Sequence, residues 1–287
     1  MNHHGLVDDP QRNADEYRRW KLGEVAAWFW PDATAEGLTI GADLMGWYFA
    51  PFDDLFDGQM GRDPLLAGRF TQDLISVLDL DGVDPGPSTH PVIAAFADLW
   101  QRSCRGMSDQ WRQRAGQNWR GYFQAQLGEV FDRRHRRILD APTCLLRRGV
   151  STSTGPIIDL IEPISGYEVP DLIWYAPVLV DLRRIVADYF GMINDLVSAD
   201  KERGHGDANL LLILEEQEQY SRDEALGEMH RISDERFARF ARLEQLVPDL
   251  DDALTPRERH AVRRHVQGLK DLIVGNNEYE HQSGRYR

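Results

Sequence analysis

The stretch DQWRQRAGQNWRGYFQAQLGEVFDRRHRRIL, residues 109–139, decides the fold class of this chain. Its apolar side chains recur at intervals of four residues, the spacing of neighbours along one face of a helix. They are Trp111, Ala115, Trp119, Phe123, Leu127 and Phe131. This spacing predicts one long amphipathic helix with a buried apolar stripe.

Helical periodicity continues outward from this stretch in both directions. Further helices are predicted at about 13–29, 36–58, 66–79, 90–105, 142–162, 171–202, 209–220, 222–246 and 256–283. The Pro and Gly clusters between them are short enough to be interhelical loops, and few segments alternate with period two. The sequence therefore predicts an all-α, single-domain bundle of about ten helices over residues 1–287.

The segment PTCLLRRGVSTSTGPIIDLIE, residues 142–162, is expected to contain a break at 149–155. Its Gly, Ser, Thr and Pro residues compete for backbone hydrogen bonds or cannot continue the helical ladder. A break in an inner helix would direct unpaired backbone groups into the bundle. A plain loop between two short helices explains the composition equally well.

Composition excludes several functions. The chain has 287 residues with 33 basic and 47 acidic side chains, a net charge of −14, so nonspecific binding to nucleic acid or an anionic membrane is not expected. A phosphate-bearing ligand would need positive charge gathered locally. We interpret the basic run DRRHRR, residues 132–137, as a solvated helix face.

No apolar run approaches the roughly 18 residues of a membrane span, and the opening residues lack an apolar signal segment. A cytoplasmic protein without membrane insertion is expected. Cys104 and Cys144 lack metal-ligand spacing and are interpreted as small core residues. The chain also lacks HExxH, GxSxG, Walker A and GxGxxG motifs.

The run WYFAPFDDLFD, residues 47–57, places three carboxylates among aromatic side chains. On a helix Asp53 and Asp57 project from one face, with Asp54 beside them. Clustered carboxylates repel one another unless a divalent cation such as Mg²⁺ neutralises them. DDxxD alone is weak, because a chain of this composition contains it by chance roughly one time in three. A solvated acidic face is the alternative, and the aromatic neighbours argue against it.

A second cluster, MINDLVSADKERG at residues 192–204, is more specific. Asn194, Ser198 and Glu202 stand four residues apart, so an amide, a hydroxyl and a carboxylate share one helical face. These oxygen ligands suit a second Mg²⁺ site. Chance produces this spacing in about one such chain in a hundred, and an incidental polar stripe is the alternative.

Together these residues resemble a known family. DDLFD followed by NDLVSADKE resembles the aspartate-rich motif and the NSE triad of bacterial class I terpene synthases. Arg148 lies 46 residues before Asn194, where that family has its pyrophosphate-sensing arginine. The C-terminal GNNEYEHQSGRYR is similar to the family pattern GNxxWxxxSxRY, with Arg285 and Tyr286 as its diphosphate-binding pair.

The resemblance implies a class I terpenoid synthase-like bundle around a central apolar cavity, and an enzyme that ionises a linear prenyl diphosphate and cyclises the carbocation. It implies three Mg²⁺ ions, with Mn²⁺ as a substitute metal. The implied metal ligands are Asp53, Asp54, Asp57, Asn194, Ser198 and Glu202. The implied diphosphate ligands are Arg148, Lys201, Arg285 and Tyr286. The aromatic candidates for carbocation stabilisation are Phe49, Phe52, Phe56 and Phe190.

The chain departs from the family pattern in places. The usual RRxTxG reads RRGVST here, so Ser151 and Thr152 are assigned by position as linker and effector, and Tyr279 replaces a tryptophan. The segment before Trp20 is shorter than is common in the family. Farnesyl diphosphate is the expected substrate, with geranylgeranyl and geranyl diphosphate open, and the family suggests a homodimer. The alternatives are a chain-lengthening prenyltransferase of the same fold and a non-catalytic helical protein that binds divalent cations.

Overall fold

The computed structural model describes residues 6, 15, 17–58, 60–80, 86, 89–204 and 208–285. All regular structure in these residues is helical, and they form no strand, which confirms the predicted all-α class. The α-helices are α2 (Leu22–Phe29), α3 (Ala35–Trp47), α4 (Asp53–Asp57), α5 (Pro64–Val77), α6 (Pro91–Ser103), α7 (Asp109–His135), α8 (Ala141–Ser151), α9 (Thr154–Asp159), α10 (Ile161–Ser165), α11 (Asp171–Trp174), α12 (Pro177–Glu202), α13 (Leu210–Glu216), α14 (Arg222–Glu244) and α15 (Pro256–Gln282).

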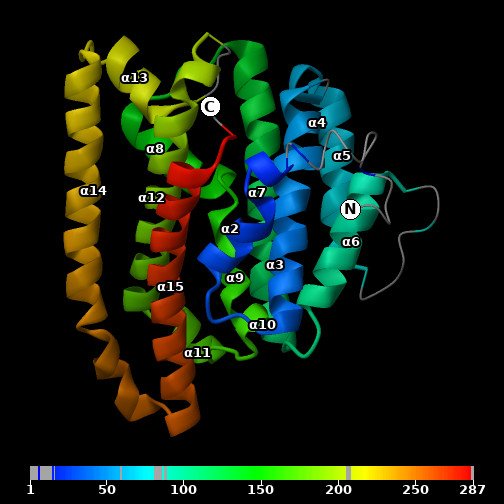
Figure 1. The fold of residues 1–287 in the computed structure, drawn as a ribbon, viewed down its shortest axis with the longest axis vertical. Coiled ribbons are helices and arrows are strands. Elements are labelled where there is room, and N and C mark those ends of the chain that lie inside the picture. The colour runs from blue at the N-terminus through cyan, green and yellow to red at the C-terminus, as the bar shows by residue number, and fades with distance from the viewer. Residues whose placement is uncertain are drawn as a thin grey trace.

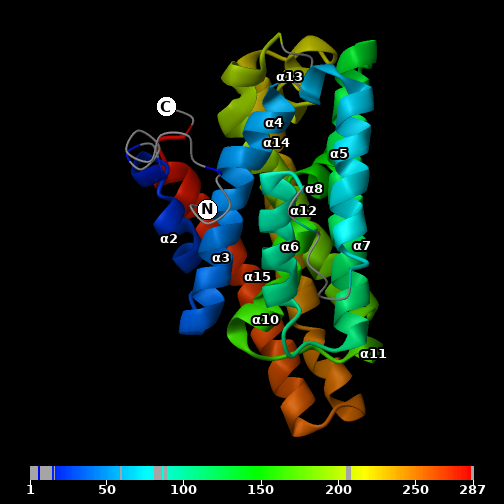
Figure 2. The same cartoon turned by 90° about the vertical axis from the view of Figure 1, so that its right-hand side faces the viewer.

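The helices form a bundle in which the long ones run roughly side by side (Figure 1). On one side α3, α5, α6 and α7 pack against one another (Figure 2), and on the other α12 contacts α14 and α15 (Figure 1). The broken helix α8–α9 lies between, against both α7 and α12. α4, α13 and the C-terminal end of α15 lie at one end of the bundle, and α10 and α11 lie at the other (Figure 1).

The helix boundaries follow from capping residues. Ser108 accepts a hydrogen bond from the Trp111 amide and starts α7, and Asn209 accepts one from the Leu212 amide and starts α13. Ser221 and Thr255 form full capping boxes at the starts of α14 and α15. These side chains satisfy amides that would otherwise have no intrahelical partner.

An aromatic cluster forms the core behind the acidic motif. Trp47 is fully buried and donates its indole N–H to the Val92 carbonyl at 2.9 Å. Phe52 lies 4.7 Å from the Trp47 ring, and Trp119 and Phe123 of α7 complete the cluster. The acidic motif is therefore the polar end of a helix whose preceding turns are core.

The stripe on α7 is confirmed only in its first half. Trp111, Ala115, Trp119 and Phe123 are buried, but Leu127 is half-buried and Phe131 is 44% exposed. A strict interval of four advances about 40° per step around a helix of 3.6 residues per turn, so the stripe winds around α7. The helix also ends at His135, because Arg136 adopts a left-handed conformation with φ of 50°.

Two predicted helices are interrupted at prolines. The predicted helix 36–58 changes to a π-helical turn over Tyr48–Phe52, with Pro51 inside it, because proline lacks the amide that the α-helical ladder requires. The predicted helix 171–202 is divided into α11 and α12, with Ala176 extended before Pro177, as the steric restriction on residues before proline requires.

The expected break in segment 142–162 is confirmed. α8 ends at Ser151 and α9 begins at Thr154, with Ser153 in the left-handed region at φ of 59°. Of the predicted helix 13–29, residues 13, 14 and 16 lie outside the described residues, and Lys21 interrupts the rest with φ of 60°. Cys144 is buried and Cys104 packs partly buried against the core. No described helix is long and apolar enough to cross a membrane.

Candidate active site

A cavity of about 680 Å³ opens at the end of the bundle that carries α4. It is lined by residues from both predicted motifs, including Asp53 and Asp57 of α4 and Lys201 and Glu202 of α12. Arg148 of α8 also lines it. The two oxygen-rich helices, far apart in the sequence, therefore share one cavity, although of the α12 triad only Glu202 is among its described lining residues.

On α4 the carboxylates meet cations across this cavity. Asp53 forms an ion pair with Arg285, and Asp57 accepts a hydrogen bond from Lys201 Nζ at 3.0 Å. Burial raises the pKa of Asp53, and the Arg285 guanidinium opposes that rise. Asp54 is exposed. Each of these two ion pairs thus joins a predicted metal ligand to a predicted diphosphate ligand.

On α12 the NSE residues divide between two partners. Asn209 donates its side-chain amide to Glu202 Oε2 at 2.9 Å and to Ser198 Oγ at 3.4 Å. The Asn194 amide oxygen instead accepts a hydrogen bond from Arg148. Asn209 thus holds Ser198 and Glu202 together, while Asn194 is coupled to the predicted sensor.

Arg148 is the centre of a buried polar network. It donates to Asp195 at 2.6 Å and to Glu129 and Ser151 Oγ at 3.3 Å each. Burial raises the pKa of Asp195 to about 7, and Arg148 opposes this rise. Gly191 of α12 allows α8 to pack this closely, because a Cβ at position 191 would lie 2.9 Å from the Cβ of Arg148.

The network exposes what the sequence patterns missed. Glu129 was not predicted, although it lies on α7 within the stretch that decides the fold. Asp195 also accepts the Leu210 amide at 2.7 Å, which ties α12 to the start of α13. The available sequence signal was Asp195 itself, because a carboxylate directly after Asn194 could pair with a buried arginine such as Arg148.

The helix break lies directly beside Arg148. Thr152 Oγ1 donates to the Arg148 carbonyl at 2.8 Å and contacts Thr154 Oγ1 at 3.0 Å. The Ser151 carbonyl accepts from Gln126 at 2.8 Å. The break therefore places hydroxyls and carbonyls next to the sensor, and the linker and effector assignments stay predictions.

The four aromatic candidates occupy different places. Phe56 lines the cavity, and Phe52 stacks behind it at a centroid distance of 4.8 Å. Phe49 stacks on Tyr279 at 5.3 Å, with the Arg285 guanidinium 4.2 Å above its ring. Phe190 meets Phe29 edge to face at 5.5 Å. Tyr279, at the position of the family's tryptophan, therefore stacks on Phe49, while Tyr286 lies outside the described residues.

The basic run 132–137 is solvated over 134–137, whereas Asp132 and Arg133 are half-buried, and the sequence did not predict its position. The side chains of 134–137 are exposed, and Arg133, Arg134 and Arg136 line the cavity together with Arg62. Hydrophobic periodicity predicts which face of a helix is exposed to solvent. It does not predict whether that face lies at a cavity.

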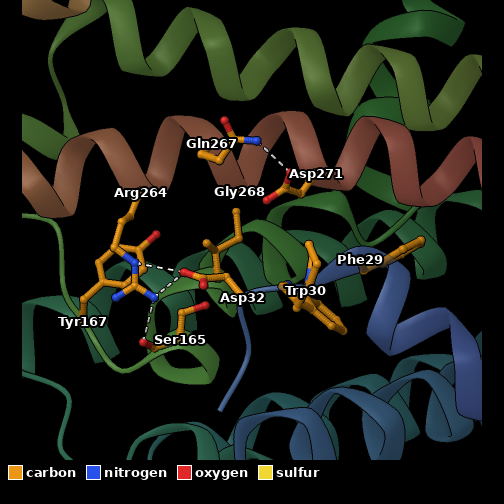
Figure 3. A pocket seen from close by; sticks show the side chains of 11 residues that line it. Phe29, Trp30, Asp32, Ser165, Tyr167, Arg264, Gln267, Gly268 and Asp271 are labelled. Carbon is orange, nitrogen blue, oxygen red and sulfur yellow. Dashed lines mark hydrogen bonds and ion pairs between the residues drawn. The ribbon is translucent and has the colours of Figure 1, made fainter.

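A second cavity, of about 380 Å³, lies elsewhere, between the segment that follows α2 and the helices α10 and α15. Figure 3 shows its polar side chains bonded to one another: Arg264 donates to Asp32 at 2.6 Å and to the Ser165 carbonyl at 3.1 Å. None of the predicted site residues lines it. The cavity at α4 is therefore the candidate active site.

The donors at that cavity fit a hard divalent cation. Among the described residues no three His, Cys, Asp or Glu side chains form a ready-made metal site. Mg²⁺ does not require one, because it is held by one or two carboxylates together with substrate phosphate and water oxygens. Asp53, Asp57 and Glu202 offer only oxygen at the cavity, and the buried Ser198 hydroxyl is joined to Glu202 through Asn209.

Comparisons with known proteins agree with this geometry. The family described as terpene synthase family 2, C-terminal metal binding, matches residues 43–239. Pentalenene synthase of Streptomyces avermitilis is 34% identical over 279 residues, covering 95% of this chain and 82% of that protein. A (−)-β-caryophyllene synthase of Saccharothrix espanaensis, named as cyclising (2E,6E)-farnesyl diphosphate, is 33% identical and covers 100% of this chain and 81% of its own.

Solved structures show the same likeness. Wild-type cucumene synthase superposes with a TM-score of 0.88 at 44% identity, over 98% of this chain and 92% of that one. Linalool/nerolidol synthase of Streptomyces clavuligerus, in complex with 2-fluorogeranyl diphosphate, gives 0.84 at 29% identity, over 98% and 90%.

An all-helical bundle in which an acidic helix and a buried arginine meet at one cavity is the architecture of a class I terpene synthase. The chain belongs to terpene synthase family 2 and is a terpene synthase of the bacterial class I type. It is an enzyme that uses a divalent metal and a prenyl diphosphate.

Proposed function

We propose that this terpene synthase is a Mg²⁺-dependent cyclase, with farnesyl diphosphate as its preferred linear substrate. The name of the caryophyllene synthase relative supports the farnesyl chain length. The geranyl analogue bound to a more distant relative keeps geranyl diphosphate as a second choice.

One observation carries the proposal: Asp53 and Asp57 line the cavity, and each forms an ion pair with a predicted diphosphate ligand, Asp53 with Arg285 and Asp57 with Lys201. A carboxylate needs a cation, and a cation needs an anion, so each pair is neutral without ligand. A metal diphosphate offers both charges at once. Carboxylates could then turn to the metal and the basic side chains to phosphate oxygens without any charge left unpaired.

The proposed roles follow the two sides of the cavity. Asp53, Asp57 and Asp54 would hold two ions, and Asn194, Ser198 and Glu202 the third. Mg²⁺ supplies Lewis-acid stabilisation of the leaving diphosphate. Lys201, Arg148 and Arg285 would donate to its oxygens, the arginines through their forked donors, and Tyr286 would join them.

The aromatic side chains would serve the hydrocarbon. Phe56 lines the cavity beside Asp53 and Asp57. Ring faces stabilise a cation electrostatically and exclude the water that would quench it. Phe49, Phe52 and Phe190 are proposed for the same role deeper in the bundle, and Thr152 is proposed to act beside the sensor.

The test is incubation with geranyl, farnesyl and geranylgeranyl diphosphate and Mg²⁺, followed by analysis of hexane-extractable products. A terpene hydrocarbon or alcohol, with the highest kcat/KM for the farnesyl substrate, is expected. A longer prenyl diphosphate would indicate a prenyltransferase. Absence of turnover with all three substrates would contradict the proposed function.

Further features belong to the same proposal. The bundle is taken as a single domain, because the main hydrophobic core contains residues from Val25 to Tyr279 and a smaller second cluster shares α12 with it. Three ions, with Mn²⁺ as a substitute, are proposed from the ligand sets. The homodimer and the cytoplasmic location stay predictions.

A further inference from the structure

The C-terminal end of α7 places an arginine cluster at the candidate active site. Arg133, Arg134 and Arg136 line the cavity together with Arg62, and we call these four residues the arginine rim. They come from the run 132–137 and from the short 3-10 turn Met60–Arg62. None of them belongs to the residues proposed to hold metal or diphosphate above.

The rim is built into the fold. Arg133 Nη2 donates to the Phe56 carbonyl at 3.4 Å, which joins α7 to the last turn of α4. Gly61 makes this contact possible, because a Cβ there would lie 1.9 Å from that carbonyl oxygen and 3.2 Å from Arg133 Nη2. The acidic motif and the rim are thus fixed relative to each other by backbone packing.

The charges of the rim differ from those deeper in the cavity. Arg148 and Lys201 have carboxylate partners. Arg62, Arg134 and Arg136 are exposed and form no ion pair with any described residue. Exposed arginines elsewhere, such as Arg231 and Arg239 of α14, do pair with carboxylates.

The local charge balance is opposite to that of the whole chain. The described lining of the cavity holds six basic side chains (Arg62, Arg133, Arg134, Arg136, Arg148 and Lys201) and four acidic ones (Asp53, Asp57, Glu129 and Glu202). The chain carries a net charge of −14, which repels a diphosphate at long range. Arg62, Arg134 and Arg136, the three exposed cations at the cavity mouth, reverse the local field, and a local field of this kind raises association rates by about 10–1000-fold.

We propose that the arginine rim is an outer binding site that captures the diphosphate group of the incoming substrate before it reaches the metal ligands. This inference rests on the proposed function, since it concerns the same substrate. Arg62, Arg134 and Arg136 form no hydrogen bond or ion pair with a predicted metal ligand among the described residues, so their contribution is to substrate encounter and not to bond breaking. Its ligand class is a free, multiply charged diphosphate.

A plainer reading is that these arginines only complement the C-terminal dipole of α7, whose last turn is basic. Loss of that dipole interaction would change the free energy of unfolding by less than about 1 kcal/mol and would not change the rate of substrate binding. The two readings therefore differ in kinetics and in salt dependence.

The test compares two charge-matched double variants. Arg134→Gln with Arg136→Gln removes two rim charges. Arg242→Gln with Arg257→Gln removes two exposed charges from the far ends of α14 and α15, at the opposite end of the bundle (Figure 1). For each, kcat and KM for farnesyl diphosphate with Mg²⁺ are measured from about 0.02 M to about 0.5 M ionic strength.

The rim variant is expected to lose about tenfold in kcat/KM at low salt, mainly through KM, and to approach the unsubstituted chain at high salt. The control variant is expected to retain the salt slope of the unsubstituted chain. An unchanged slope and unchanged kcat/KM in the rim variant would overturn the inference.

A binding measurement is independent of turnover. Inorganic diphosphate is titrated calorimetrically into the metal-free protein in EDTA, and the rim variant is expected to bind at least about threefold more weakly than the control. Equal binding by both variants would also overturn the inference. If the unsubstituted chain turned over no prenyl diphosphate, the proposed function would fail, and this titration would still decide whether the rim binds the anion.

Discussion

Glu202 tests the proposed third metal site at the scale of one residue. Its side chain lines the cavity and accepts a hydrogen bond from Asn209. Glu202→Gln keeps the size of the side chain and removes its charge, so a metal ligand is lost without a packing defect. Because loss of even an outer-shell partner costs 10–100-fold, we expect kcat/KM to fall by more than about 100-fold.

Two measurements check this prediction. Product formation with Mg²⁺ reports the catalytic loss, and thermal melting reports stability, which is expected to stay the same. Glu235→Gln on the exposed face of α14 is the matched control and is expected to keep normal turnover. Retention of a near-normal rate by Glu202→Gln would remove Glu202 from the metal site.

Asp159 carries a pH dependence at the same scale. It is 1% exposed and accepts one hydrogen bond, from Asn118 at 2.8 Å, and burial raises its pKa to about 6. A raised carboxyl pKa means that the folded chain binds the proton more tightly than the unfolded chain. The free energy of unfolding therefore falls as pH rises from about 4 to about 6 and stays lower above that.

Asp159→Asn removes this penalty. We expect the free energy of unfolding to rise by roughly 2 kcal/mol at about pH 7.5 and by about half as much at pH 5. Urea unfolding at the two pH values measures the difference. Asp181→Asn, at an exposed ion pair, should change little at either pH. A gain that did not grow with pH would show that burial of the charge is not the cause.

At the scale of elements, the π-helical turn Tyr48–Phe52 decides where the acidic motif points. One extra residue per turn rotates everything that follows by about 100° relative to a regular α-helix. Pro51 favours this turn because its missing amide weakens the α-helical ladder. Asp53 follows directly and meets Arg285, so the turn sets a site geometry at some cost in helix stability.

Pro51→Ala restores the missing donor and lets the regular α-helical register compete. We expect kcat/KM to fall by at least about tenfold while the free energy of unfolding rises by on the order of 1 kcal/mol, as stability and activity often trade at such positions. Kinetics and urea unfolding measure both effects. Pro64→Ala is the control, because Pro64 begins α5, where proline is favourable, and it should not gain stability. Equal activity in Pro51→Ala would show that the turn does not aim Asp53.

At the scale of the whole molecule, the sequence predicted helices and acidic faces well because periodicity is local. The break beside Arg148 followed from Gly, Ser and Pro chemistry. The winding of the apolar stripe on α7 also follows from helix geometry. The interval of four residues nevertheless led to the wrong prediction that Phe131 is buried. The division of the predicted helix 171–202 at Pro177 shows that one proline can end a helix inside a long helical hydrophobic pattern.

Contacts between distant segments could not be predicted in the same way. The run 132–137 was correctly interpreted as solvated over 134–137, but its position at the cavity depends on how α7 packs on α4. Glu129 carries no motif and gains meaning only when α8 brings Arg148 to it. Neither relation has a period, a cap or a spacing that one sequence could display.

The ion pairs across the cavity predict that metal and diphosphate bind together. Mg²⁺ alone would take Asp53 and Asp57 from Arg285 and Lys201 and so deprive each of these cations of a carboxylate partner. Diphosphate alone would likewise deprive the carboxylates of their basic partners. With both present every charge is paired, so their binding free energies should be more favourable together than as a sum.

The paired ions also link α4, α12 and the C-terminal segment, and amides near residues 203–204 and 283–285 should gain protection from hydrogen exchange. At concentrations about 100-fold above the dissociation constant the complex should gain about 2.7 kcal/mol, which raises Tm by several degrees. Thermal melting with Mg²⁺, with inorganic diphosphate and with both measures the synergy, and Arg285→Gln should weaken it. Shifts that simply added, or a variant with undiminished synergy, would contradict this coupling.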